Sequence, residues 1–199
     1  MSEPGSKGIL FVISAPSGTG KTTVATMILS LVDDLRKTVS HTTRKIRDGE
    51  ENGVDYHFVD EERFLGMIGE GDFIEWAQVF GNYYGTSARE IESSLALGHD
   101  LLLVIDVQGA ASVRSTKSFF SRTIFLLPPS MEELERRLVG RGQDSPESIR
   151  MRLESAAGEM GHRNDFDYQV VNDKLTSTVE EVRDIILAER EKHRGGKGS

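Results

Sequence analysis

A lysine followed by two hydroxyl residues ends a glycine-containing loop near the N-terminus. The segment SAPSGTGKTT, residues 14–23, follows directly on the apolar run ILFVI. Apart from Ala15 in its first position, it matches G-x-x-x-x-G-K-[ST], a pattern whose backbone N–H groups surround nucleotide phosphates. Gly18 and Gly20 allow the backbone to approach a phosphate closely, and Lys21 can reach the β- and γ-phosphates. We therefore expect a phosphate site, since a ligand-free turn needs neither the lysine nor the hydroxyl.

A metal site is predicted beside this loop. The Thr22 hydroxyl follows Lys21 directly, and Asp106 ends the apolar run DLLLVID at residues 100–106. A hydroxyl and a strand-end carboxylate suit Mg²⁺, which accompanies a bound triphosphate. Asp106 has a second interpretation, as the cap of a helix that begins near Gly109. The two roles are compatible and both stay open.

A second group of polar residues occupies the segment SHTTRKIRDGEENGVDYHF, residues 40–58. Arg44 and Arg47 can hold one phosphate between their planar guanidinium groups. Ser40 and Tyr56 can add hydroxyl donors. A solvated charged loop is the alternative, and it would be favoured for two arginines alone. The phosphate loop upstream instead favours a second phosphate site here.

The elements that must position these residues alternate between strand and helix. Short apolar runs, typical of strands covered on both faces, occupy residues 8–13, 100–106, 122–127 and 168–172. Apolar residues at helical spacing predict helices over residues 21–32 and 178–190. This order is typical of an α/β fold in which helices cover both faces of a parallel sheet.

Two segments interrupt that order. Residues about 38–96 contain alternating runs such as YHFV and FIEWAQVF, which predict antiparallel strands and hence an inserted β-rich lobe. Residues about 136–166 carry many arginines and little apolar periodicity, and Pro146 follows Ser145 at a predicted helix start. We expect this second segment to form a mobile helical lid. We expect a single domain of residues 1–199, whose core comprises residues about 8–37, 97–135 and 167–193.

Composition narrows the class of protein. The chain has 199 residues, 37% of them hydrophobic, which suits one domain with a substantial core. Its net charge of −8 argues against a broad nucleic-acid-binding face, although a pocket needs only local positive charge. The absence of cysteine excludes disulfides and thiolate chemistry. With no signal peptide and no apolar run of about 18 residues, we expect a cytoplasmic protein without membrane or nucleic-acid partners.

Five motifs together resemble the guanylate kinase family. They are SAPSGTGKTT, SHTTRKIRDGEENGVDYHFV, FIEWAQVFGNYYGTS, IDVQGA and RLVGRGQDSPESIRMRL, in this order over nearly the whole chain. Many nucleoside triphosphatases share the first motif, whereas the second and third are particular to this family. The resemblance implies a three-layer P-loop core and Mg²⁺-dependent transfer of the γ-phosphoryl group of ATP to GMP or dGMP, without a covalent enzyme intermediate.

The resemblance also implies roles for individual residues. The ATP-binding set is Ala15, Pro16, Ser17, Gly18, Thr19, Gly20, Lys21, Thr22 and Thr23, with Asn172 and Asp173 near the adenine. The GMP-binding set is Ser40, Arg44, Arg47, Tyr56 and Tyr84 at the phosphate, Glu75 and Thr86 at the base, and Asp106. The catalytic set is Lys21, Arg44 and the lid arginines Arg137, Arg141 and Arg152. The metal ligands are Thr22 and Asp106.

The pair Glu75 and Thr86 suits guanine on chemical grounds. Guanine presents N1–H and N2–H₂ as adjacent donors and O6 as an acceptor, which a carboxylate and a hydroxyl complement. Adenine would place an acceptor opposite Glu75 and leave a charged group unpaired. The alternative for Glu75 is an outward-facing position on an amphipathic strand. For each lid arginine the alternative is a solvated helix face with i,i+4 ion pairs.

Two other functions stay open. A related kinase with another acceptor, such as a ribose bisphosphate, would share the phosphate loop but would not need a guanine reader. The guanylate-kinase-like interaction modules of scaffold proteins bind phosphopeptides without catalysis, and they typically have a degraded phosphate loop. The intact Lys21 and Thr22, together with Glu75 and Thr86, favour phosphoryl transfer to GMP.

Overall fold

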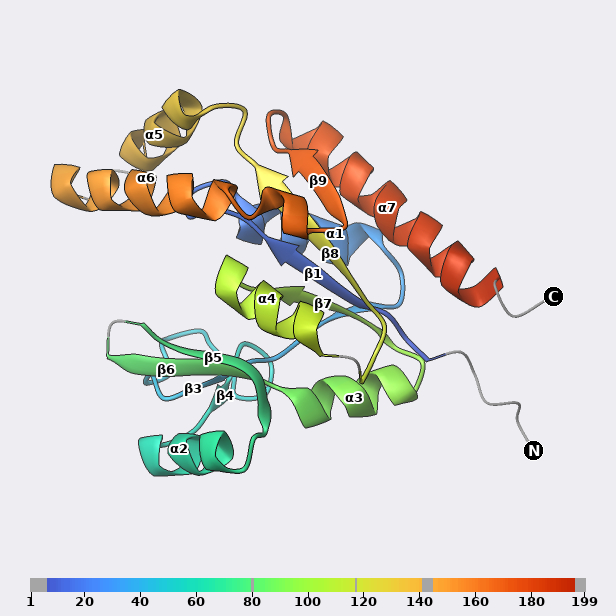
Figure 1. Ribbon diagram of the computed structural model, residues 1–199. Coiled ribbons are helices and arrows are strands. Elements are labelled where there is room, and N and C mark those ends of the chain that lie inside the picture. The colour runs from blue at the N-terminus through green and yellow to red at the C-terminus, as the bar shows by residue number, and fades with distance from the viewer. Residues whose placement is uncertain (1–6, 80, 117, 141–144, 196–199) are drawn as a thin grey trace.

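A five-stranded parallel sheet forms the centre of the molecule. The computed structural model describes residues 7–79, 81–116, 118–140 and 145–195 (Figure 1). The strands follow the order β2-β7-β1-β8-β9. They are β1 (Leu10–Ser14), β2 (Leu35–Lys37), β7 (Asp100–Val104), β8 (Ser121–Leu127) and β9 (Tyr168–Val171). The predicted α/β fold with a parallel sheet is confirmed, and β2 is a strand too short to show an apolar pattern.

Helices cover both faces of this sheet (Figure 1). One face carries α1 (Lys21–Leu31) and α7 (Leu175–Gly195), and the other carries α3 (Ala88–Ala96) and α4 (Val107–Ser115). Strand β1 contributes Phe11 and Ile13 to the first interface, and Leu10 and Val12 to the second. Because both of its faces are covered, β1 is apolar throughout most of its length.

A separate four-stranded sheet forms the β-rich lobe, in the order β4-β3-β6-β5. Its elements are β3 (His41–Thr42), β4 (His57–Phe58), α2 (Glu61–Gly69), β5 (Phe73–Val79) and β6 (Asn82–Ser87). Strands β5 and β6 pair antiparallel, as predicted, and β3 joins β6 in the same manner. The prediction is wrong for YHFV, because β4 runs parallel to β3. Residues 43–56 provide the long connection that a parallel pair needs.

Two further helices, α5 (Met131–Gly140) and α6 (Pro146–Met160), pack against each other through Leu134, Leu138 and Ala156. Helix α6 begins where the sequence predicts, because the Ser145 side chain accepts a hydrogen bond from the Ser148 N–H at 3.2 Å. A short 3₁₀ helix, η1 (Arg163–Asp165), leads on to β9. The lobe and these helices project from the same end of the core (Figure 1). This end carries the carboxyl ends of the parallel strands, where α/β folds bind ligands.

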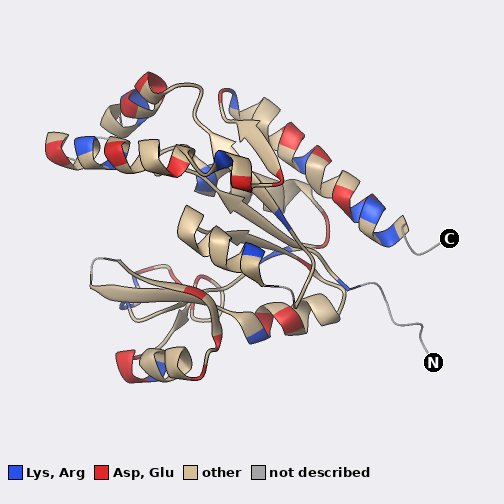
Figure 2. Ribbon diagram, in the orientation of Figure 1, with Lys and Arg blue, Asp and Glu red and all other residues tan. Residues whose placement is uncertain are grey.

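Charged residues of both signs alternate along α5, α6 and α7 (Figure 2). The arginines of α5 and α6 therefore lie among carboxylates rather than on a surface of one sign. In the described part of the chain, no helix combines the length and the apolar character needed to span a bilayer.

Candidate active site

The loop between β1 and α1 places the predicted phosphate-binding residues at the carboxyl end of β1. Gly18 and Gly20 have φ angles of +94° and +100°, a region that residues with a side chain rarely adopt. A Cβ atom on Gly18 would lie 2.8 Å from Leu138 Cδ2, and one on Gly20 would lie 2.8 Å from Asn172 Nδ2. The backbone angles therefore favour glycine at both positions, and the neighbouring side chains would have to shift to admit a Cβ atom.

A cavity of about 270 Å³ lies over this loop, and Lys21 lines it together with Thr22, Asp106 and Glu159. The Lys21 Nζ donates hydrogen bonds to the carbonyl oxygens of Ala15 and Ile105, each at 3.2 Å. Burial lowers the pKa of Lys21, whereas the carboxylates of Glu159 and Asp106 raise it. The ammonium group is thus held over the loop, where an anion would be its natural partner.

Asp106 is the N-cap of α4, as one of its two interpretations predicts. Its Oδ1 accepts a hydrogen bond from the Gly109 N–H at 2.8 Å. Its carboxylate also raises the pKa of Lys21 on one side and of Glu75 on the other. Asp106 therefore lies between the phosphate loop and the predicted base-reading pair, with Oδ1 used by the cap.

Glu75 and Thr86 face each other across the hairpin of β5 and β6. Thr86 Oγ1 donates to Glu75 Oε1 at 2.6 Å, and Ser40 Oγ lies 3.1 Å from the same hydroxyl. Burial raises the pKa of Glu75, although the hydrogen bond from Thr86 lowers it. A Cβ atom on Gly109 would lie only 3.3 Å from Glu75 Cγ, so this glycine allows α4 to pack against the carboxylate. Glu75 is partly buried rather than solvated on an outer face.

The two predicted phosphate-binding arginines of the lobe share one carboxylate. Arg44 donates from Nη2 and Nη1 to the two oxygens of Glu50, at 2.7 and 3.0 Å. Arg47 donates its backbone N–H to Glu50 at 2.8 Å, and its side chain is exposed. The hydrogen bonds from Arg44 and Arg47 hold the pKa of Glu50 below its usual value. The guanidinium group of Arg44, which the sequence predicts to bind a phosphate, is thus paired with Glu50 in this structure.

Tyrosine rings surround this ion pair. The Arg44 Cζ lies 5.5 Å from the centre of the Tyr56 ring, and the Tyr56 and Tyr84 rings are 6.0 Å apart. A cavity of about 220 Å³ between α1 and the lobe is lined by Thr22, Ser40 and Tyr56, among others. Thr22 also lines the cavity over the phosphate loop. The structure therefore connects the predicted donor and acceptor groups through one residue.

Arg137 and Arg152, two of the predicted lid arginines, contact the loop side of the core. Arg152 Nη1 donates to Ser17 Oγ at 3.3 Å, which brings α6 to the phosphate loop. Arg137 donates to the carbonyl oxygens of Asn172 and Asp173, at 2.9 and 3.4 Å, and also pairs with Glu133 at 2.8 Å. The i,i+4 pair that the alternative interpretation predicts is therefore present for Arg137. Arg141 lies outside the described residues.

Asn172 and Asp173 line a third cavity, of about 380 Å³, beside the phosphate loop. Asn172 is buried, and its Nδ2 donates to the Thr19 carbonyl oxygen at 2.6 Å. Arg137 and Thr23 also line this space. Asn172 thus supports the loop directly, and the cavity that it lines adjoins the phosphate loop.

The sequence profile of the guanylate kinase family matches residues 7–189. The chain belongs to the guanylate kinase family. A guanylate kinase from Methylobacillus flagellatus is 52% identical over 184 residues, covering 92% of this chain and 91% of the relative. One from Dechloromonas aromatica is 49% identical over 183 residues, covering 91% and 89%.

Solved structures agree with this membership of the guanylate kinase family. The crystal structure of guanylate kinase from Anaplasma phagocytophilum has a TM-score of 0.72 at 40% identity, covering 93% of this chain and 87% of that one. A gluconokinase from Sinorhizobium meliloti 1021 has a TM-score of 0.53 at 16% identity and covers 98% of both chains. The second likeness concerns the fold alone.

Three residues at the site of this guanylate kinase family member were not predicted. Glu50 follows Arg44 by six residues and Arg47 by three. A carboxylate this close to two arginines could have indicated the ion pair. Gly109 matters because of its contact with Glu75, and Glu159 because α6 crosses the phosphate loop. No local pattern marks the last two, since both act on residues distant in the sequence.

Proposed function

We propose that this member of the guanylate kinase family transfers the γ-phosphoryl group of ATP to GMP or dGMP, giving ADP and the diphosphate. The observation that carries the proposal is the position of Thr22, which lines both the cavity over the phosphate loop and the cavity that reaches Ser40 and Tyr56. Two nucleotides bound in these cavities would meet at their phosphates. Holding two reactants in line is a large part of what phosphoryl transfer requires.

In this proposal the donor binds along the loop. The N–H groups of residues 15–20 and the N-terminus of α1 receive the β- and γ-phosphates, and Lys21 stabilises their charge. The adenosine occupies the third cavity, beside Asn172 and Asp173. The hydrogen bond from Asn172 to the loop backbone supports this arrangement, because it holds the proposed adenine-binding residue against the phosphate loop.

The acceptor base binds between β5, β6 and α4. Glu75 accepts hydrogen bonds from guanine N1–H and N2–H₂, and Thr86 turns its hydroxyl from Glu75 to guanine O6. Ser40, Arg44, Arg47, Tyr56 and Tyr84 receive the acceptor phosphate. Since none of the proposed base contacts involves the ribose 2′-OH, dGMP is expected to serve as well as GMP.

The chemical step follows from this placement. An oxygen of the acceptor phosphate attacks the γ-phosphorus, and the bond to the β,γ-bridging oxygen breaks as ADP leaves. Lys21 and Arg44 offset the charge on the transferring oxygens, together with the lid arginines Arg137, Arg141 and Arg152. Arg44 must exchange Glu50 for the acceptor phosphate, so the carboxylate keeps the arginine in position until GMP arrives.

The donor set at the loop fits Mg²⁺. Thr22 and Asp106 line the same cavity as Lys21, and both offer hard oxygen ligands of the kind that Mg²⁺ prefers. When bound, the ion would neutralise charge on the β- and γ-phosphates. Asp106 keeps its cap on α4 at the same time, and this hydrogen bond orients its carboxylate.

The same proposal assigns a different role to each region of the chain. The core, residues about 8–37, 97–135 and 167–193, binds the donor, the lobe of residues about 38–96 binds the acceptor, and the lid of residues about 136–166 excludes water. The contact of Arg152 with Ser17 supports a lid that closes onto the loop. A cytoplasmic location and the absence of nucleic-acid partners stay predictions.

An acceptor panel tests the proposal. ADP release from ATP and Mg²⁺ is measured with GMP, dGMP, AMP, dTMP and ribose 1,5-bisphosphate in turn. We expect rapid turnover with GMP and dGMP and little with the others. Turnover with ribose 1,5-bisphosphate or AMP but not GMP would refute the proposal, and no turnover with any acceptor would indicate a binding module.

The matched control is Lys21→Ala, which removes the ammonium group and leaves the loop glycines in place. We expect this variant to lose phosphoryl transfer while its circular dichroism and melting temperature stay close to those of the unaltered chain. Retained turnover would mean that the ADP came from a contaminating kinase or that the loop does not bind the donor.

A further inference from the structure

Two imidazoles and a carboxylate meet in the lobe, away from the phosphate loop. His41 lies on β3, His57 on β4 and Glu90 on α3. The Glu90 oxygens lie 3.6 Å from His57 Nε2 and 3.9 Å from His41 Nε2. The three potential ligand atoms all lie within 4.8 Å of one another. Three elements that are separate in the sequence thus converge on one point.

One nitrogen of the buried His41 ring has no hydrogen-bond partner among the residues that the structure describes. His41 is only 8% exposed, and the nitrogen without a partner is Nδ1. Its Nε2 is too far from Glu90 for a hydrogen bond at 3.9 Å. Buried polar groups in native proteins are nearly always satisfied, and an ion is one of the explanations for an exception. An imidazole nitrogen without a proton has a lone pair to offer to such an ion.

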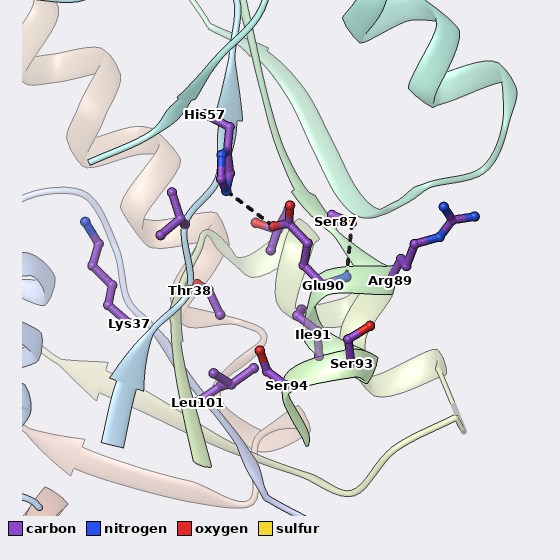
Figure 3. A pocket seen from close by; sticks show the side chains of 12 residues that line it. Lys37, Thr38, His57, Ser87, Arg89, Glu90, Ile91, Ser93, Ser94 and Leu101 are labelled. Atoms are coloured by element: carbon purple, nitrogen blue, oxygen red, sulfur yellow. Dashed lines mark hydrogen bonds and ion pairs between the residues drawn. The ribbon is translucent and has the colours of Figure 1, made fainter. Parts of the chain in front are cut away.

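A cavity of about 380 Å³ borders the cluster and is lined by His57 and Glu90. Figure 3 shows these two side chains pointing toward each other, while Arg89 points away from them. The cavity therefore provides an entry path and space for a water molecule. Glu90 is the carboxylate within 4 Å of both imidazoles, at 3.6 and 3.9 Å, and the charged groups of Arg63 and Asp72 also lie within electrostatic reach of His41.

We propose that His41, His57 and Glu90 bind one Zn²⁺ ion, with water from the cavity as the fourth ligand. Two histidines and one glutamate form a known zinc ligand set, with metal–ligand distances of about 2.0–2.2 Å. A tetrahedral site with these distances places its ligands about 3.4 Å apart, which compares with 3.6 and 3.9 Å for the two pairs with Glu90 and with at most 4.8 Å between the two histidine nitrogens. The two imidazole rings lie 4.6 Å apart at an interplanar angle of 30°, so binding requires both rings to turn their nitrogens toward the ion.

This site is different in kind from the proposed Mg²⁺ site. Imidazole nitrogens suit Zn²⁺, whereas Mg²⁺ prefers the oxygen ligands of Thr22 and Asp106. Bound Zn²⁺ would join β3, β4 and α3. These elements lie next to Ser40, Tyr56 and Thr86, so the ion would brace the acceptor side of the molecule without touching the reacting phosphates.

Cobalt spectroscopy and calorimetry test the proposal. The full chain without an affinity tag is freed of metals and titrated with Co²⁺ in excess Mg²⁺, which occupies oxygen-only sites. We expect the visible bands of four-coordinate Co²⁺ to rise to one equivalent per chain and to disappear when Zn²⁺ is added. Calorimetry with Zn²⁺ alone should give the same stoichiometry.

His57→Gln and Glu90→Gln are the deciding variants, since the buried His41 is more apt to affect folding. The backbone N–H of Glu90 donates to the Ser87 cap, so Glu90→Gln leaves the start of α3 intact. Each variant should weaken Zn²⁺ binding at least about tenfold. Both should keep Mg²⁺-dependent phosphoryl transfer, which checks their folding.

His162→Gln is the matched control, because His162 pairs with Asp165 at 3.2 Å on the surface, where two ligands alone bind metal weakly. This variant should bind Zn²⁺ as the unaltered chain does. Absence of saturable binding, binding retained at full affinity by either deciding variant, or binding lost in His162→Gln would overturn the proposal.

Discussion

Glu75 is placed where burial opposes its negative charge. Burial is the main cause that raises its pKa, with a further increase from Asp106, and the hydrogen bond from Thr86 only partly offsets them. The ionised carboxylate therefore lowers the free energy of unfolding at neutral pH. This destabilisation disappears as the pH falls and the group protonates. A residue held at such a cost fits a role in binding, because guanine donors would stabilise the charge.

Glu75→Gln should remove the preference for GMP while ATP binding persists. Loss of hydrogen bonds to a charged group, about 1.5–3 kcal/mol, predicts a KM for GMP about 10- to 100-fold higher. In the unaltered chain the KM for GMP should begin to rise at a higher pH than protonation of an ordinary glutamate would require, since protonation of a carboxyl with a raised pKa removes an acceptor. Initial rates at varied GMP and pH measure both effects.

Glu70→Gln, at an exposed position of the same lobe, is the control and should behave as the unaltered chain. The melting temperature of Glu75→Gln should be equal or higher at pH 7, because the variant carries no buried charge. An unchanged acceptor profile in Glu75→Gln would mean that Glu75 does not read the base.

At the scale of elements, a buried ion pair ties α7 to the central sheet. Asp100 at the start of β7 is only 2% exposed and accepts a hydrogen bond from Arg190 Nε at 2.6 Å. It also accepts from the Ile9 N–H at 2.8 Å and from Arg194 at 3.1 Å. Arg190 donates onward to the Asp33 carbonyl oxygen at 2.8 Å. One carboxylate thus joins α7, β7 and the segment leading into β1.

Asp100→Asn should lower the free energy of unfolding by about 3–5 kcal/mol, since it leaves a buried guanidinium group without its counter-charge. Urea denaturation followed by circular dichroism measures the change. Asp184→Asn is the control, because Asp184 pairs with Arg183 at an exposed position and should contribute at most about 1 kcal/mol. Equal losses in the two variants would contradict the argument from burial.

Across the whole molecule, the two proposed substrates bind to different parts. Trp76, the single tryptophan of the chain, lies on β5 beside Glu75, and it is 48% exposed with its ring 6.2 Å from that of Tyr83. Lys21 lies on α1 at the phosphate loop. The indole therefore reports on the acceptor side without contacting the donor loop.

GMP should change the fluorescence of Trp76 in the unaltered chain and in Lys21→Ala with similar midpoints, because the lobe keeps its contacts in the variant. In Glu75→Gln the midpoint should move to higher GMP concentration by the factor expected for KM. Fluorescence titration in the absence of ATP measures both. A loss of the GMP response in Lys21→Ala would show that the acceptor side depends on the donor loop.

The sequence by itself determined those features that depend on local geometry. The loop of residues 14–23 is predictable because two glycines, a lysine and a hydroxyl at fixed spacing specify one backbone path. The buried strands β1, β7, β8 and β9 are predictable because a strand covered on both faces has to be apolar. The cap at Asp106 also follows from neighbours within three residues.

Only the tertiary structure decided which distant groups meet. Glu159 faces Lys21 because α6 crosses the loop, and Arg190 reaches Asp100 across 90 residues of sequence. The parallel pairing of β3 and β4 brings His41 beside His57, and the packing of α3 adds Glu90. Apolar periodicity indicates which side of an element is buried, but the partner on that side depends on the packing of the whole chain.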